Sequence, residues 1–290
     1  MQGLGIPVAL VGAVFLALGA QFQHRGVGKV EAQHGRSRSG LGIAHLVALF
    51  NRPSWVIGTL LLGLAILFQL ISLSLAPLIV VQPLGVVALV ITALVNARVT
   101  GAKLDRLTIR SIALCVGGVA IFVTIAAFVA HEEAITDTQL LTVLIILGTV
   151  LASAAVAFAL LRKRLRLKAL IYIVAAGVLY GFVATLAKVV INRMVSNNFD
   201  ALTVFCIAAL LAATALGGYF VQTAYSSGPP DLVIAGLTVV DPLVAVGIGI
   251  VVLGEAANAP LSAVVAFAVA GALAIYGVFE LAKHHPQSQH

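Results

Sequence analysis

Nine long apolar segments, separated by short polar breaks, dominate the pattern of hydrophobic and polar positions along this chain. Each segment approaches or exceeds the roughly 20 residues that an α-helix needs to cross about 30 Å of hydrocarbon. The expected cores are Leu4–Gln23, Pro53–Leu75, Leu78–Val99, Thr108–Val129, Thr138–Leu161, Ala169–Asn192, Leu202–Ala224, Leu232–Leu253 and Leu261–Leu281. None shows the alternation that is typical of barrel strands. The pattern therefore predicts an all-α membrane protein with nine transmembrane helices.

The composition supports the same interpretation. The chain has 290 residues, of which 61% are hydrophobic and 9% are charged, whereas soluble domains carry about 25% charged residues. No polar break is long enough for a soluble domain, so residues 1–290 are expected to form a single integral membrane domain. Met1–Pro7 contains no Lys or Arg, which favours a retained first span over a signal peptide.

The net charge of +7 is distributed unevenly between the two sides of the predicted bundle. If nine helices alternate, the Lys and Arg residues in the breaks after the first, third and fifth segments and in the C-terminal tail fall on one side. The opposite breaks contain Arg193, Glu132, Glu133, Asp137, Asp200 and Glu255. Because basic loops stay cytoplasmic, we expect the N-terminus outside, the C-terminus inside and a cytoplasmic loop at residues 24–52. Loop anchoring explains the charge, and no nucleic-acid partner is expected.

The two halves of the chain resemble each other at a constant spacing. The matched pairs are Gln69 and Gln222, Pro77 and Pro230, Gly101 and Gly254, and Gly118 and Gly271. A competing register matches Gln82-Pro83 with Asp241-Pro242. Because the third and eighth segments run in opposite directions, the sequence predicts two inverted repeats, residues 1–130 with four helices and 138–282 with five. Such repeats are typical of secondary transporters, and we expect a central cavity lined by the first, third, sixth and eighth segments.

These motifs resemble those of the drug/metabolite transporter superfamily. Pro242, an apolar run and Leu253-Gly254-Glu255 are similar to the ending of its EamA-like members. The first half is more similar to the NIPA-type magnesium transporters, through Ala76-Pro77, Gln82-Pro83-Leu84-Gly85 and Gly101-Ala102-Lys103-Leu104-Asp105. The resemblance implies gating roles for Pro83, Pro242 and Glu255. Both branches usually have Glu at the end of the motif helix in each half. This chain has Ala102 there in the first half and keeps the acid only in the second half, as Glu255. Any role of that acid in gating or cation attraction therefore falls to one residue in place of two.

Asp241 is the candidate residue with the clearest chemical signal. It lies about 13 Å inside the eighth segment, at 1.5 Å per residue. A carboxylate in hydrocarbon costs several kcal/mol unless it is protonated, paired or hydrated. One interpretation is a proton- or cation-responsive site that faces a cavity, and the other is a structural acid satisfied by neighbouring helices. Intramembrane acids favour the functional interpretation.

The remaining candidates for a substrate or ion pathway are polar residues within spans. Lys188 either extends its side chain to the outer membrane surface or faces the substrate, as a similar Lys in the NIPA-type pattern implies. Gln69 and Gln222 are related by the repeat, so they are expected to line one pathway from its two ends. Gln82 and Tyr180 complete the set. Metal ligation stays open, and no cofactor is expected because phosphate-binding loops and His-Glu-x-x-His spacing are absent from the sequence.

The sequence therefore predicts a secondary transporter in a bacterial-type plasma membrane, and not an enzyme. It would move a small metabolite by alternating access, with Asp241 as the coupling acid and the lipid bilayer as its surroundings. One alternative is a NIPA-like transporter of magnesium or another divalent cation, although Mg²⁺ requires several oxygen ligands. The other alternative is a non-transporting structural subunit of a membrane complex. A monomer and a homodimer both remain open.

Overall fold

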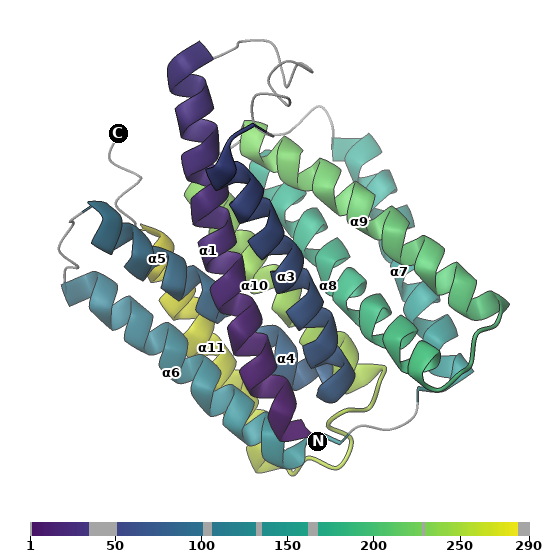
Figure 1. Ribbon diagram of the computed structural model, residues 1–290. Helices are drawn as coiled ribbons and strands as arrows, with labels where there is room; N and C mark the ends of the chain where they lie inside the picture. The colour runs from purple at the N-terminus through teal and green to yellow at the C-terminus, as the bar shows by residue number, and fades with distance from the viewer. Residues whose placement is uncertain are drawn as a thin grey trace.

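The computed structural model describes residues 2–34, 51–100, 106–131, 135–161, 168–227 and 230–283, and its regular elements are all helices (Figure 1). They are α1 (Gln2–His34), α3 (Pro53–Leu75), α4 (Leu78–Leu84), α5 (Val86–Thr100), α6 (Arg106–Val129), α7 (Asp137–Leu161), α8 (Lys168–Val195), α9 (Ala201–Ser227), α10 (Pro230–Val251) and α11 (Leu261–Lys283). The described residues include nine helical spans that are long and apolar enough to cross a membrane. This confirms the prediction of an all-α, multi-pass membrane protein.

The first helix is longer than the apolar pattern predicts. Apolar character ends near Gln23, but α1 continues to His34, so the prediction of a loop is wrong for residues 24–34. The extension includes Lys, Glu, Ala and Gln residues, which favour helix formation without being apolar. The middle of the predicted loop, residues 35–50, lies outside the described residues.

The third span consists of two helices, where the sequence predicts one. α4 ends at Leu84 and α5 begins at Val86, although the intervening Gly85 keeps a helical backbone with φ −57° and ψ −29°. Pro83 explains the interruption, because its nitrogen cannot donate to the carbonyl one turn earlier. Every residue of α4 is buried. This burial fits the rule that irregular backbone at membrane depth is surrounded by protein.

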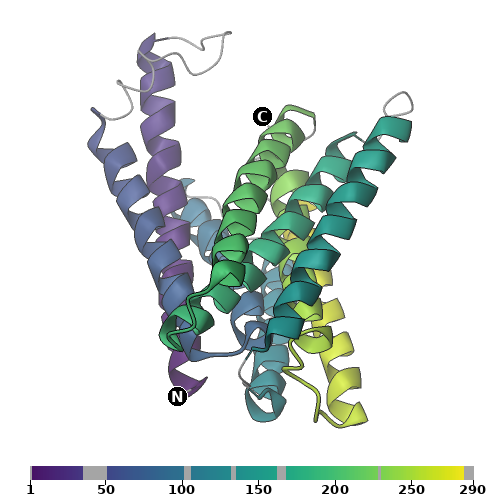
Figure 2. The ribbon, with the colours of Figure 1, turned by 90° about the vertical axis from the view of Figure 1, so that its right-hand side faces the viewer.

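Close helix pairs determine how the spans are arranged. α1 packs mainly against α3, α8 against α9 and α10, and α6 against α11, and Figures 1 and 2 show these partners side by side. We refer to the side where α1 begins and α3 ends as the N-terminus side, and to the side where α11 ends as the C-terminus side.

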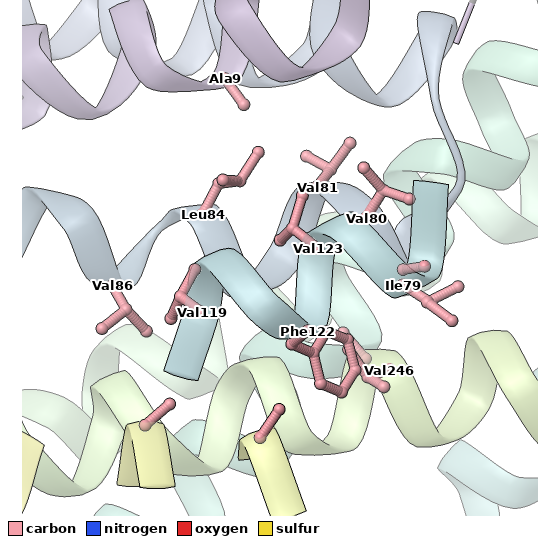
Figure 3. Close-up of a cluster of buried hydrophobic side chains, with 14 of the residues drawn as sticks. Ala9, Ile79, Val80, Val81, Leu84, Val86, Val119, Phe122, Val123 and Val246 are labelled. Carbon is pink, nitrogen blue, oxygen red and sulfur yellow. The ribbon is translucent and has the colours of Figure 1, made fainter. Parts of the chain in front are cut away.

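The largest apolar core surrounds α4, which packs there against α1, α6 and α10, and residues of α11 also belong to this core. Figure 3 shows part of it, with Val81 and Leu84 of α4 near Ala9 of α1 and Val119 of α6. Phe122 of α6 stacks at a tilt on the α11 ring of Phe267, with 4.8 Å between the ring centroids. A second core joins α7, α8 and α9 to α10. α10 therefore contacts both cores, at the centre of the bundle.

The α6–α11 contact gives a first testable prediction. A Cβ atom at Gly118 would lie 2.6 Å from the backbone nitrogen of Ala274 and 2.8 Å from the carbonyl oxygen of Ala270. Neither backbone atom can move aside easily, so Gly118→Ala is expected to lower the free energy of unfolding by about 1–3 kcal/mol. Thermal unfolding of the purified protein in detergent measures the effect.

The neighbouring Gly117 provides a matched control. A Cβ atom there meets no atom within 4 Å, so Gly117→Ala should instead stabilise the helix by about 0.5–1 kcal/mol. Equal melting temperatures for the Gly117→Ala and Gly118→Ala variants would contradict the close α6–α11 contact.

Candidate functional site

A cavity of about 680 Å³ lies at the centre of the bundle. Its volume falls within the range of roughly 300–1,000 Å³ that small-molecule sites occupy. The four spans that the sequence predicts as lining all contribute, as α1, α4 with α5, α8 and α10, and they are joined by α3 and by one residue of α9. The predicted central cavity is therefore present, with a wider lining.

The cavity wall is mostly apolar, with a small polar set. Its polar members are Gln69, Gln82, Tyr180, Tyr225, Thr238 and Asp241. Asp241 is the only charged residue among the described residues that line it. Four of the predicted pathway residues, Gln69, Gln82, Tyr180 and Asp241, therefore lie together around one cavity.

Two buried polar atoms in this wall lack a hydrogen-bond partner within the described part of the chain. They are Oδ1 of Asp241 and Nε2 of Gln82. Gln82 as a whole is only 5% exposed. Most buried polar atoms in native proteins are hydrogen-bonded, and leaving one unpaired costs about 1–3 kcal/mol. An unpaired acceptor and an unpaired donor therefore make this cavity the candidate site for polar ligand atoms.

Small residues hold Asp241 at the cavity wall. At Gly177 of α8, a Cβ atom would lie 2.6 Å from Cβ of Val240, and at Gly181 it would lie 3.0 Å from the carbonyl oxygen of Asp241. α8 and α10 can approach this closely because both positions are glycine. Pro242 follows directly and cannot donate to the Thr238 carbonyl, so the acid lies next to a weakened helical turn.

Pro83 and Pro242 lie near each other in space. Both line a second, apolar cavity of about 70 Å³ between α4, α5, α6, α10 and α11. Val86, Thr238 and Pro242 line both cavities and form a shared wall. Gln82 and Pro83 therefore contact the same two cavities as Asp241 and Pro242.

Lys188 lies on the N-terminus side, beyond the end of the cavity. It is only 3% exposed, and its Nζ donates to the carbonyl oxygens of Ala76 at 2.8 Å and of Leu73 at 3.3 Å. These carbonyls end α3, where the helix dipole favours a cation. The structure thus contradicts the expectation of a side chain at the membrane surface. Lys188 is also not among the residues that line the cavity, so this conformation does not support the substrate-facing alternative.

Glu255 completes this arrangement from the connection between α10 and α11. Its Oε1 accepts from the backbone N–H of Leu78 at 2.8 Å, and its Oε2 from that of Ile79 at 2.9 Å. These are N–H groups of the first turn of α4, which have no partner within the helix. Oε1 also lies 3.9 Å from Nζ of Lys188. We refer to Lys188, Glu255 and residues 73–79 as the junction clamp.

The charges expected in loops on the N-terminus side are partly structural. Glu255 is only 3% exposed, and Arg193 is 5% exposed. Arg193 donates to Asp137 at 2.5 Å, to Asp200 at 2.7 Å and to the hydroxyl of Thr203 at 2.8 Å, which ties the end of α8 to the starts of α7 and α9. The N–H and hydroxyl of Thr203, together with Arg193, lower the pKa of Asp200 below its usual range. Arg193 and Glu255 lie in breaks between spans, as the sequence predicts, and there they join the ends of helices.

Two further residues differ from the sequence-based site. Gln222 is exposed on α9 and does not line the cavity, so its expected role beside Gln69 is not supported. Tyr225, three residues later on α9, lines the cavity instead, as does Thr238 of α10. The available signal for Tyr225 was an aromatic hydroxyl near the end of an apolar span, which is common at membrane surfaces and so does not single out a site.

Comparison with known proteins adds one relative. An uncharacterized protein of Corynebacterium glutamicum is 28% identical to this chain over 254 residues, which cover 87% of this chain and 85% of the relative. No family model and no solved structure matches the chain. The similarity therefore extends over most of the chain.

Proposed function

We propose that this protein is a secondary transporter of the drug/metabolite type, which moves a small molecule through the central cavity by alternating access. The observation that carries the proposal is the pair of unpartnered buried atoms, Asp241 Oδ1 and Gln82 Nε2, in one cavity of about 680 Å³. A purely structural bundle gains no stability from such atoms. In a transporter, the bound substrate supplies the missing partners, and the site lies near the membrane midplane between the halves.

The two ends of the cavity support an alternating-access interpretation. Towards the C-terminus side, the lining includes the exposed residues Leu16, Tyr225 and Ile234. Towards the N-terminus side it ends at buried Leu73, the first residue of the junction clamp, in which Ala76 and Leu78 are also buried. We therefore interpret this conformation as open towards the C-terminus side and closed towards the N-terminus side. With the predicted orientation, this corresponds to an inward-facing state.

Flux into proteoliposomes tests the proposal directly. The purified protein is reconstituted, a pH or Na⁺ gradient is imposed, and uptake or release is followed for a panel of small amines, amides, amino acids and sugars together with Mg²⁺. We expect gradient-driven flux of at least one organic compound. Gradient-driven flux of Mg²⁺ alone would favour the divalent-cation alternative. The absence of flux for every compound would favour a structural subunit.

The predicted orientation is tested separately by labelling single cysteines. Ser37 and Gln287, which lie outside the described residues, are expected on the cytoplasmic side, and the exposed Thr136 on the outside. A membrane-impermeant maleimide added to intact cells should therefore label Thr136→Cys alone. The native Cys115 and Cys206 are buried, so their background is low. Labelling of Ser37→Cys without Thr136→Cys would reverse the orientation.

A further inference from the structure

The two unpartnered atoms of the cavity need opposite hydrogen-bonding partners, one a donor and the other an acceptor. Oδ1 of Asp241 can only accept when the carboxylate is ionised, so it needs a donor, and it is best satisfied by a positively charged one. Nε2 of Gln82 can only donate, so it needs an acceptor. Both atoms are buried at the wall of the same cavity. A ligand that satisfies both must therefore carry a cationic donor and an acceptor.

The charge of the cavity restricts the acceptor. Asp241 is the only charged residue among the described residues that line the cavity. Lys188 of α8 does not line the cavity, and it donates to Ala76 and Leu73 in the junction clamp. A ligand carboxylate or phosphate would thus lose its hydration without gaining a cation, which is unfavourable in a low-dielectric site. The acceptor that Gln82 meets is accordingly neutral, such as a carbonyl oxygen.

The rest of the wall fits the body of such a molecule. Tyr180 and Tyr225 supply aromatic rings, which attract ammonium groups and apolar groups alike. Most other lining residues are aliphatic. We propose that the cavity binds an organic monocation that carries a protonated amine for Asp241, a neutral hydrogen-bond acceptor for Gln82 and an apolar side group. This substrate class rests on the proposed transport function.

Binding to the purified full-length protein in nanodiscs, followed by calorimetry, tests the substrate class. Two ligand series are used, one with an isobutyl and one with a benzyl side group. The first series consists of leucinamide, isoamylamine, 4-methylpentanamide and leucine. The second consists of phenylalaninamide, phenethylamine, 3-phenylpropanamide and phenylalanine. In each series the members carry, in turn, amine with neutral acceptor, amine alone, acceptor alone, and amine with carboxylate.

In at least one series, the amino-amide is expected to bind about tenfold more tightly than each of its three relatives, since each lacks one hydrogen bond or adds an unpaired charge. Gln82→Leu should abolish the advantage of the amino-amide over the simple amine. The matched variant Gln222→Leu, which alters an exposed glutamine outside the cavity, should preserve it. Asp241→Asn should abolish the advantage of the amino-amide over the acceptor-only amide.

Several outcomes would overturn the inference. These are no binding in either series, equal affinity for the amino-amide and the amino acid, or an unchanged preference in the Gln82→Leu variant. The flux assay separates this inference from the proposed function. Selective binding without any flux would reject transport and retain the ligand class. Gradient-driven flux of a compound outside this class, without selective binding of the amino-amides, would retain transport and reject the ligand class.

Discussion

Glu255→Ala is expected to lower the free energy of unfolding by about 3–5 kcal/mol, because it leaves the buried ammonium of Lys188 without its carboxylate. The same change removes the acceptor of the Leu78 and Ile79 N–H groups, which are buried with it. Lys188 keeps its bonds to Ala76 and Leu73, but carbonyls do not neutralise its charge. Thermal unfolding in detergent, followed by loss of the monodisperse peak, measures the effect.

A double-mutant cycle separates the ion pair from the capping of α4. Glu255→Gln retains one side-chain acceptor for α4 but no charge, so it should destabilise the protein less than Glu255→Ala. Adding Lys188→Met to Glu255→Gln removes the uncompensated cation, and the double variant should be more stable than the sum of the single effects implies. If Glu255→Ala melts within 2 °C of the unmodified protein, the junction clamp contributes little to the fold.

The spans were predictable from sequence because insertion into a bilayer depends on the length and apolar character of each continuous segment. Nine apolar runs of sufficient length predicted nine spans, and the helices begin and end within a few residues of the expected positions. The prediction failed where a polar segment is nevertheless helical, as in α1 beyond Gln23. The interruption at Gly85 was also missed. A proline permits but does not require such a break, as the uninterrupted α10 shows at Pro242.

The candidate site was only partly predictable, because the role of a polar residue depends on which face of its helix turns inward. Asp241, Gln69, Gln82 and Tyr180 face the cavity as the transport hypothesis requires. For Lys188, the decisive partners come from α3 and from the connection after α10, distant in sequence. The pattern of apolar residues within α8 cannot indicate which distant segments Lys188 contacts. Hence the sequence indicated a basic residue within a span, but neither of the two roles expected for Lys188 was the structural one that these contacts give it.

The clamp and the cavity together suggest how the two ends differ. On the N-terminus side, Glu255 and Lys188 hold the α3–α4 junction closed. The predicted repeat matches Glu255 with Ala102, so the first half of the sequence lacks an acid at the matching position. We expect the N-terminus end, held by charged capping groups, to open less readily than it would without them.

Asp241→Asn is expected to lower gradient-driven flux by about 100-fold or more, the usual range for losing a positioned proton-transfer group. Asn keeps the size of the side chain and its capacity to accept a hydrogen bond, but it cannot ionise. Stability should change little, because Oδ1 of Asp241 has no partner within the described chain to lose. A neutral amide is also less costly than a carboxylate in a low-dielectric site. A structural acid predicts the opposite result, namely altered stability with normal flux.

The decisive measurement compares Asp241→Asn with Asp241→Leu and with Glu280→Gln, which neutralises an acid of α11 outside the cavity lining. Each variant is quantified for expression, melting temperature and flux driven by an imposed pH gradient in proteoliposomes. Asp241→Asn and Asp241→Leu should both lose flux, whereas Glu280→Gln should retain it. A protonated carboxyl group is neutral and no longer attracts an ammonium ion. Binding of a proton to Asp241 should therefore release a cationic substrate from it. Normal pH-dependent flux in the Asp241→Asn variant would contradict this exchange and reduce Asp241 to a residue of the cavity wall.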